Sequence, residues 1–256
     1  MTNPSGFGAA RRLTFHVPLS TTRADRLVAE LASRKPASVT DFGCGWGELL
    51  LRVLDAAPQA HGIGVELHGP DVERARGNAA GRGLAHRATF VEGDAREHLS
   101  PADLVISSGA YQAFGSIPDA LQALRPLVNP GGRLLFSCEI WERTPTAEEL
   151  TNLWPGSTVD TCLHLPDLVD QAVAAGFRPL GIETSTRGEW DSFESGFAAD
   201  AEEWLLANSN HPEADAERAR LDAHRTTWLR GSREVVGFAF LTLGVPTDTP
   251  RTAERP

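Results

Sequence analysis

A glycine-rich segment that follows a predicted strand is the part of this sequence best suited to hold a ligand. It reads Asp41-Phe-Gly-Cys-Gly-Trp-Gly47 and leads at once into an apolar stretch with helical spacing. Glycines at alternate positions (Gly43, Gly45 and Gly47) let the backbone approach a ligand where any Cβ would collide. The helix that follows offers free N–H groups and the positive end of its dipole to a polar group. The segment therefore predicts a binding site for a nucleoside-bearing cofactor.

Further polar residues stand at the ends of the next predicted strands. Glu66 ends the second strand and is suited to accept hydrogen bonds from both hydroxyls of a ribose. Asp94 lies just past the third strand, where its carboxylate could accept a hydrogen bond from an exocyclic amine. Ser107 and Ser108 follow the fourth strand in a run of small residues. Because ligands bind outside the carboxyl ends of the strands in open α/β sheets, we expect these residues at one edge of the sheet.

Strands and helices alternate along the middle of the chain. Apolar runs bounded by turn residues predict strands at 38–42, 61–66, 88–91, 102–107, 133–138 and 180–184, with a turn at 129–132. Helical spacing with Pro and Gly at the ends predicts helices at 21–34, 47–57, 70–82, 118–127 and 166–175. This alternation predicts an α/β fold, a doubly wound, mostly parallel Rossmann-like sheet with helices on both faces.

The alternation stops near residue 188. Residues 188–234 hold two helical stretches, and a last strand follows at 235–243. We interpret residues 188–234 as a helical insert before the last strand. The expected organisation is an N-terminal segment and helix (1–37), a cofactor-binding core (38–187), the insert (188–234), the last core strand (235–244) and a disordered tail (245–256).

As a set, these motifs resemble those of the class I S-adenosylmethionine-dependent methyltransferases. The glycine segment Asp41–Gly47 is similar to the first motif of that family, Glu66 to the second and Gly93-Asp94-Ala95 to the third. Leu127-Val-Asn-Pro-Gly-Gly132 is similar to the segment before the family's fifth strand. The resemblance covers roughly residues 38–184 and is specific as a set. It implies S-adenosylmethionine as the cofactor and S-adenosylhomocysteine as the product.

The resemblance also implies a role for the residues at the strand ends. Asp41 and the loop from Gly43 to Gly47, with Cys44 and Gly45, would hold the methionine part of the cofactor. Glu66 would hold the ribose, and Asp94 with the backbone of Ala95 would hold the adenine. We assign Leu67, Ser107 and Ser108 to the same cofactor site.

Two other classes of protein stay open at this point. A nicotinamide-dependent oxidoreductase also carries an acidic residue after its second strand, but it prefers G-x-G-x-x-G, and here the third glycine falls one place earlier. A nicotinamide-dependent oxidoreductase would also leave Asp94 without a role. The second alternative is a protein that binds S-adenosylmethionine without catalysing transfer.

Residues on the acceptor side are expected after the fourth and fifth strands and outside the core. We predict Glu139 and Tyr111 as catalytic residues, Glu139 as a base or as a group that orients the acceptor. A solvated loop carboxylate or an ion pair with Arg143 is the structural alternative for Glu139, and packing on the adenine or against the insert is the alternative for Tyr111. The predicted contacts to the substrate are His16, Gln112, Trp141 and Trp190.

The composition of the chain limits the kinds of substrate and partner that it can bind. The 256-residue chain has a formal net charge of -10 and no basic patch, which disfavours nucleic acid as a substrate. Its three cysteines show no metal-binding spacing, and no apolar run reaches the length of a membrane span. We therefore predict a cytoplasmic enzyme that methylates oxygen or nitrogen of a small molecule by in-line displacement, without a metal and without a membrane partner. A homodimer stays open.

Overall fold

The computed structural model describes residues 10–247, so the expected disordered tail (245–256) falls largely outside the described residues. The chain divides into two compact units. Within the described residues, unit 1 comprises residues 10–21, 139–165 and 184–239, and unit 2 comprises residues 22–138, 166–183 and 240–247.

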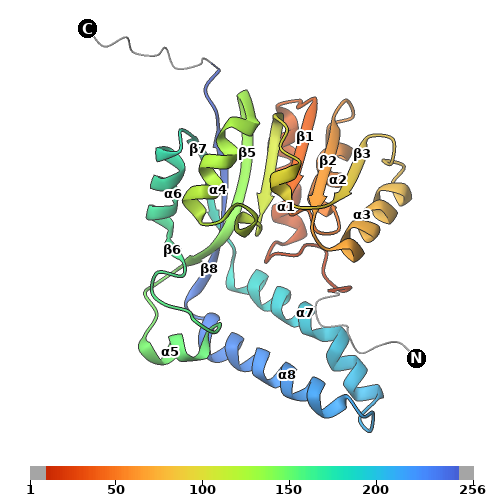
Figure 1. The fold of residues 1–256 in the computed structure, drawn as a ribbon, viewed down its shortest axis with the longest axis vertical. Coiled ribbons are helices and arrows are strands. Elements are labelled where there is room, and N and C mark those ends of the chain that lie inside the picture. The colour runs from red at the N-terminus through yellow and green to blue at the C-terminus, as the bar shows by residue number, and fades with distance from the viewer. Residues whose placement is uncertain (1–9, 248–256) are drawn as a thin grey trace. The chain divides into compact units, whose positions relative to one another are not determined.

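One sheet runs through the described chain, and its strand order is β3-β2-β1-β4-β5-β8-β7, with β6 paired to β5 (Figure 1). The strands are β1 (Ser38–Phe42), β2 (His61–Glu66), β3 (Ala88–Glu92), β4 (Ala102–Ser108), β5 (Val128–Trp141), β6 (Leu163–His164), β7 (Arg178–Thr184) and β8 (Val236–Gly244). The pairs β1–β2, β2–β3, β1–β4 and β4–β5 are all parallel. The carboxyl ends of β1 to β4 therefore meet at one edge of unit 2, as predicted.

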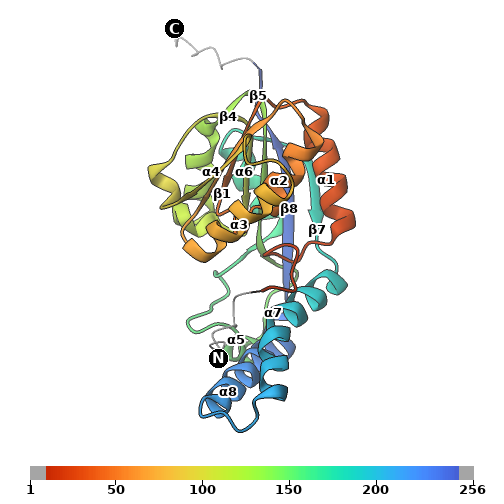
Figure 2. The same cartoon turned by 90° about the vertical axis from the view of Figure 1, so that its right-hand side faces the viewer.

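Helices of unit 2 lie where the apolar spacing placed them. They are α1 (Thr21–Ser33), α2 (Glu48–Ala56), α3 (Gly69–Gly81), α4 (Ile117–Leu124) and α6 (Leu165–Ala174). Seen from the side, α1 and α4 cover opposite faces of the sheet (Figure 2). The helices bury their apolar faces against the strands, and β8 is buried along its whole length. The predicted doubly wound α/β architecture is confirmed.

Two predicted boundaries in unit 2 are wrong. The helix expected at 118–127 ends as an α-helix at Leu124 and continues as a 3-10 turn, because Pro126 cannot donate the helical hydrogen bond and disfavours helical geometry before it. The turn expected at 129–132 belongs to β5. Gly131 donates to the carbonyl of Val245, and Val245 donates to the carbonyl of Gly132, so backbone pairing with the segment after β8 extends the strand.

Unit 1 contains the two predicted helices and two elements that the sequence did not indicate. α7 (Arg187–Ala207) and α8 (Ala214–Thr226) pack together through Ala201, Leu205, Ala214 and Leu221. A π-helical turn (Thr227–Ser232) continues α8, and the short helix α5 (Ala147–Asn152) lies against that turn. Across residues 10–247, the helices are all too short or too polar to cross a membrane.

Candidate functional site

The glycine loop between β1 and α2 is built so tightly that only glycine fits at its turning points. Gly43, Gly45 and Gly47 have φ values of 70°, 52° and 76°, in the left-handed region. A Cβ on Gly43 would stand 2.3 Å from the Cβ of Ala110. The amides of Gly43 and Cys44 donate to the carbonyl of Val65 at 2.8 and 3.1 Å, which fixes the loop on β2. The loop thus has a tight backbone turn fixed on β2, and its role in holding the cofactor stays a prediction.

Glu66 at the end of β2 is held by the glycine loop itself. One carboxylate oxygen accepts from the amide of Gly45 at 2.9 Å, and the other accepts from the amide of His68 at 3.0 Å. Each oxygen retains a second lone pair, so two hydroxyl groups of a ribose can still be bound. Leu67, the next residue, is 75% exposed and offers a flat apolar surface. Both residues suit the roles predicted for them.

Asp41, at the end of β1, is a buried carboxyl group with an unusual pKa. Its side chain is only 3% exposed. Burial first, and then the negative charge of Glu66, raise the pKa of Asp41 to about 8. Burial and the same two carboxylates also hold the pKa of the Cys44 thiol well above its usual value. A positively charged ligand group beside Asp41 would favour its ionised form, which fits a cationic cofactor.

Asp94 and Ala95 follow β3, but the structure adds a partner that the sequence did not suggest. The Asp94 carboxylate caps the 3-10 turn η1 (Ala95–Glu97), accepting from the amide of Arg96 at 2.9 Å. It also accepts from the guanidinium of Arg96 at 2.6 Å, and these bonds lower the pKa of Asp94 to about 2. To bind Asp94, an adenine amine would therefore have to share the carboxylate with the Arg96 side chain or displace that side chain. The spacing Asp-x-Arg was the only sequence signal for this pair.

The segment after β4 brings two further predicted residues to the same edge. Ser107 is fully buried, and its hydroxyl has no hydrogen-bond partner among the described residues. The hydroxyl of Ser108 pairs with that of Ser137 at 2.6 Å. The 3-10 turn η2 (Tyr111–Phe114) follows, with Tyr111 half-buried and Gln112 exposed, and it lies against η1. The structure thus gathers in unit 2 the cofactor residues that the sequence predicted, together with Tyr111.

Trp46, the large residue within the glycine loop, faces a helix of unit 2. Its ring is 3% exposed and lies 3.9 Å from the guanidinium carbon of Arg74 on α3. The carbonyl of Trp46 accepts from the side chain of Asn78 at 3.0 Å. Trp46 therefore fastens the loop to α3.

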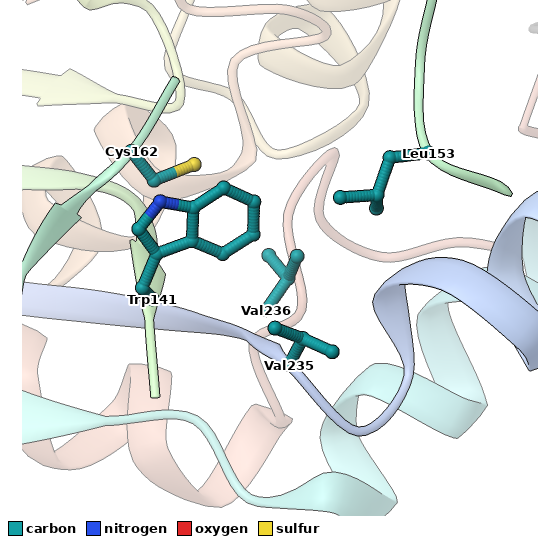
Figure 3. Packing of buried hydrophobic residues seen from close by; sticks show 5 residues of the cluster. All are labelled: Trp141, Leu153, Cys162, Val235 and Val236. Carbon is teal, nitrogen blue, oxygen red and sulfur yellow. The ribbon is translucent and has the colours of Figure 1, made fainter. Parts of the chain in front are cut away.

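Glu139 and Trp141 lie at the carboxyl end of β5, in the part of the strand that belongs to unit 1. Burial raises the pKa of Glu139. Burial first, and then the charge of Glu139, raise the pKa of Cys162 to about 12. Arg143 pairs with Glu149, and not with Glu139. Trp141 belongs to a buried cluster with Leu153, Cys162, Val235 and Val236 (Figure 3). Its indole N–H donates to the carbonyl of Val159 at 2.8 Å, so this donor is already used within unit 1.

The two remaining predicted residues, Trp190 and His16, also lie in unit 1. Trp190 packs against the Trp141 cluster and meets the rings of Phe193 and Phe238 edge to face, with centroids 6.0 and 6.2 Å away. Its indole N–H is buried without a hydrogen-bond partner among the described residues. His16 stacks on Phe197, at a centroid distance of 6.3 Å.

Sequence reasoning missed a contact between a histidine and a carboxylate beside these rings. Nε2 of His224 on α8 lies 2.9 Å from a carboxylate oxygen of Glu194 on α7, and its ring is 5.8 Å from that of Phe197. The side chain of Glu194 is almost fully buried. No motif connects residues 194 and 224, since only the packing of the two helices makes them neighbours.

Known proteins resemble this chain over nearly its whole length. Residues 40–134 match the family described as "Methyltransferase domain". The chain is 30% identical over 241 residues to a malonyl-[acyl-carrier protein] O-methyltransferase of Pseudescherichia vulneris, covering 92% of this chain and 88% of that protein. Among solved structures, a SAM-dependent methyltransferase from Thiobacillus denitrificans in complex with S-adenosyl-L-homocysteine has a TM-score of 0.81 at 25% identity, covering 95% of this chain and 99% of that one. A SAM-dependent methyltransferase from Geobacter sulfurreducens, also in complex with S-adenosyl-L-homocysteine, has a TM-score of 0.83 at 24% identity, with 98% and 99% covered, and shows the same fold.

Proposed function

Since the chain belongs to the class I S-adenosylmethionine-dependent methyltransferases, we propose that it methylates an oxygen or nitrogen atom of a small molecule. S-adenosylmethionine is the cofactor, which decides against the nicotinamide oxidoreductase that the sequence left open. The methyltransferase family and the relatives named as methyltransferases decide for an enzyme over a non-catalytic binding protein. The acceptor itself is the proposed part. The relative from Pseudescherichia vulneris is named an O-methyltransferase, which supports oxygen as the acceptor atom.

The residues of unit 2 fit this cofactor in type and position. The loop at Gly43, which has no room for a Cβ, would take the methionine part, and the buried carboxyl group of Asp41 would face its positive charge. Glu66 would bind the ribose, with Leu67 against the adenine. Asp94 would accept from the adenine amine. When bound, S-adenosylmethionine supplies a methyl group on a sulfonium, an electrophile with a neutral leaving group.

The raised pKa of Glu139 is the observation that supports an acceptor with an O–H or N–H group. A hydroxyl or amine must lose a proton as it is methylated, and a carboxylate of raised pKa is a better base near neutral pH than an ordinary one. Burial raises the pKa of Glu139, and the residue stands two positions past Ser137, the partner of Ser108 in the β4–β5 ladder. We assign proton removal to Glu139 and positioning of the acceptor to Tyr111. Without a base, holding the nucleophile in line with the methyl group would still supply most of the rate.

The remaining contacts to the acceptor and the cellular compartment are proposed from fewer observations. Trp190 would offer its unpartnered indole N–H to an oxygen of the acceptor, and His16, Gln112 and Trp141 stay proposed contacts. The net charge of -10 disfavours a nucleic-acid acceptor. The three cysteines are free, which fits the reducing cytoplasm. Direct transfer without a metal, and a homodimer as an open alternative, remain predictions.

Transfer of a labelled methyl group tests the proposal. The protein, incubated with S-adenosylmethionine labelled in its methyl group and a metabolite extract, should label a small organic product that mass spectrometry shows to be O- or N-methylated. Label appearing only in nucleic acid or protein would contradict the proposed acceptor class.

The role of Glu139 has a separate test on the identified acceptor. Glu139→Gln should lower kcat by about 10²–10⁴-fold, the usual contribution of a general base, and leave binding of S-adenosylhomocysteine unchanged. Glu203→Gln, at an exposed carboxylate on α7, is the matched control and should retain full activity. Equal kcat values in the Glu139 variant and the control would remove Glu139 from the reaction.

A further inference from the structure

A basic hollow lies in unit 2 at the edge of the sheet opposite the glycine loop. It has a volume of about 190 Å³ and is lined by the end of α1 and the segment after it, the first residues of β4 and the start of β5. Asp103 lies at the start of β4, whereas Ser107 and Ser108 close that strand at the cofactor edge. Four strand residues span about 13 Å, so the hollow is separate from the cofactor site.

Three cationic side chains and one carboxylate line this hollow, namely those of Arg34, Lys35, Arg133 and Asp103. The carboxylate of Asp103 is already committed to the fold. One of its oxygens accepts from the amides of Ala37 and Ser38 at 2.9 and 3.2 Å, and the other accepts from the side chain of Asn129 at 2.8 Å. These bonds lower the pKa of Asp103, so it stays ionised, and its single negative charge offsets only one of the three cations.

Arg133 is anchored with part of its guanidinium free. Nη1 donates to the carbonyls of Gly131 and Gly132 at 2.8 and 2.9 Å, which leaves Nε and Nη2 as donors. Gly132 lets β5 lie close to β4 beside Arg133, since a Cβ there would stand 2.7 Å from the carbonyl oxygen of Asp103. The side chain is thus held in place and can offer a planar pair of donors to an oxyanion.

The three cations in the hollow outnumber the acids that act on them, Asp103 and Glu30. Partial burial, and then the positive charge of Arg34, lower the pKa of Arg133, while Glu30 opposes this effect. Neither Arg34 nor Lys35 forms an ion pair with a described residue. Basic residues after a helix also complement its dipole, which accounts for Arg34 and Lys35 at the end of α1. The dipole of α1 does not explain the presence of Arg133, which lies on β5.

We propose that this hollow is a binding site for a phosphate-type oxyanion, with Arg133 as its anchor and Arg34 and Lys35 as further donors. A water molecule occupies about 30 Å³, so the hollow has room for inorganic phosphate or for one phosphate group of a larger metabolite. S-adenosylmethionine carries no phosphate, so this site serves a second ligand. An anion bound here would stabilise the fold through the ends of α1, β4 and β5.

Calorimetric titration with inorganic phosphate and with diphosphate, at constant ionic strength and without cofactor, tests the site. The wild-type protein should bind at least one of these anions. Arg133→Gln should weaken binding by about tenfold or more, and Arg34→Gln in the same direction. Arg218→Gln on α8 removes the same charge from an exposed helix position and should leave the affinity unchanged. Saturating S-adenosylhomocysteine should also leave it unchanged.

Two results would overturn the proposal. One is a wild-type protein that binds neither anion, and the other is equal affinity in the wild type and both hollow variants. If Arg133→Gln does not fold, the exposed Arg34→Gln variant alone decides, since its side chain supports no contact in the fold. None of these readouts requires methyl transfer, so failure here is distinct from failure of the proposed function.

Discussion

Replacing Asp41 by Asn should remove a large dependence of stability on pH. The carboxyl group is 3% exposed at the end of β1, and burial together with the charge of Glu66 raises its pKa from 3.8 to about 8. Asn has nearly the same shape and cannot ionise. The comparison therefore isolates the free energy of removing one proton from a buried site.

The sign and size of the effect follow from linkage. In the unfolded chain Asp41 loses its proton near pH 3.8, but in the folded protein it keeps the proton to about pH 8. The stability that this proton contributes is therefore fully present below pH 3.8 and is lost as the pH rises through about 8. At 1.36 kcal/mol for each pH unit, this interval corresponds to about 5–6 kcal/mol in the free energy of unfolding.

Denaturant unfolding at several pH values measures this difference. Between about pH 5 and pH 8, the wild-type protein should lose roughly 4 kcal/mol relative to Asp41→Asn. Asp215→Asn, at a 95% exposed side chain on α8, should follow the wild type. Titrating groups that do not interact with Asp41 act alike in both proteins and cancel. Parallel stability curves for the wild type and Asp41→Asn would refute the reasoning.

Cofactor binding should release the same proton from Asp41. A positively charged ligand group beside Asp41 stabilises the carboxylate, so S-adenosylhomocysteine, with its ammonium group, should release protons from the wild type near pH 7. Calorimetry in buffers of different ionisation enthalpy should then give different heats for the wild type and the same heat for Asp41→Asn. Buffer-independent heats for the wild type would place the cation away from Asp41.

Three further changes have defined outcomes. Gly43→Ala should destabilise the fold by at least about 1–2 kcal/mol and abolish cofactor binding, because φ is 70° there and the new Cβ meets Ala110; calorimetry showing normal affinity would contradict this. Arg87→Ala should cost about 1.5–3 kcal/mol in denaturant unfolding, because its guanidinium donates to three carbonyls at and after the end of α2; a smaller loss in Arg87→Lys would support this cause. Asp94→Ala should weaken S-adenosylhomocysteine binding, whereas Asp215→Ala should not; unchanged affinity would show that Asp94 does not hold the adenine.

The sequence alone determined the sheet, its parallel strands and the residues at their carboxyl ends. These features depend on local signals, since alternating apolar runs, turn residues and a glycine-only loop have few other structural solutions. Once the strands are parallel, their ends must meet at one edge, so Asp41, Glu66 and Asp94 could be grouped before any coordinates. The cofactor followed from this grouping and from the resemblance that it carries.

Only the tertiary structure decided how these groups are charged and paired. The pKa of Asp41 depends on burial by residues distant in sequence and on Glu66, and the pairing of Asp94 with Arg96 depends on the turn between them. The neighbours Glu194 and His224 come from two helices whose packing no local pattern encodes. Charge and pairing depend on solvent exclusion and on distances across the fold, and these exist only when the whole chain has folded.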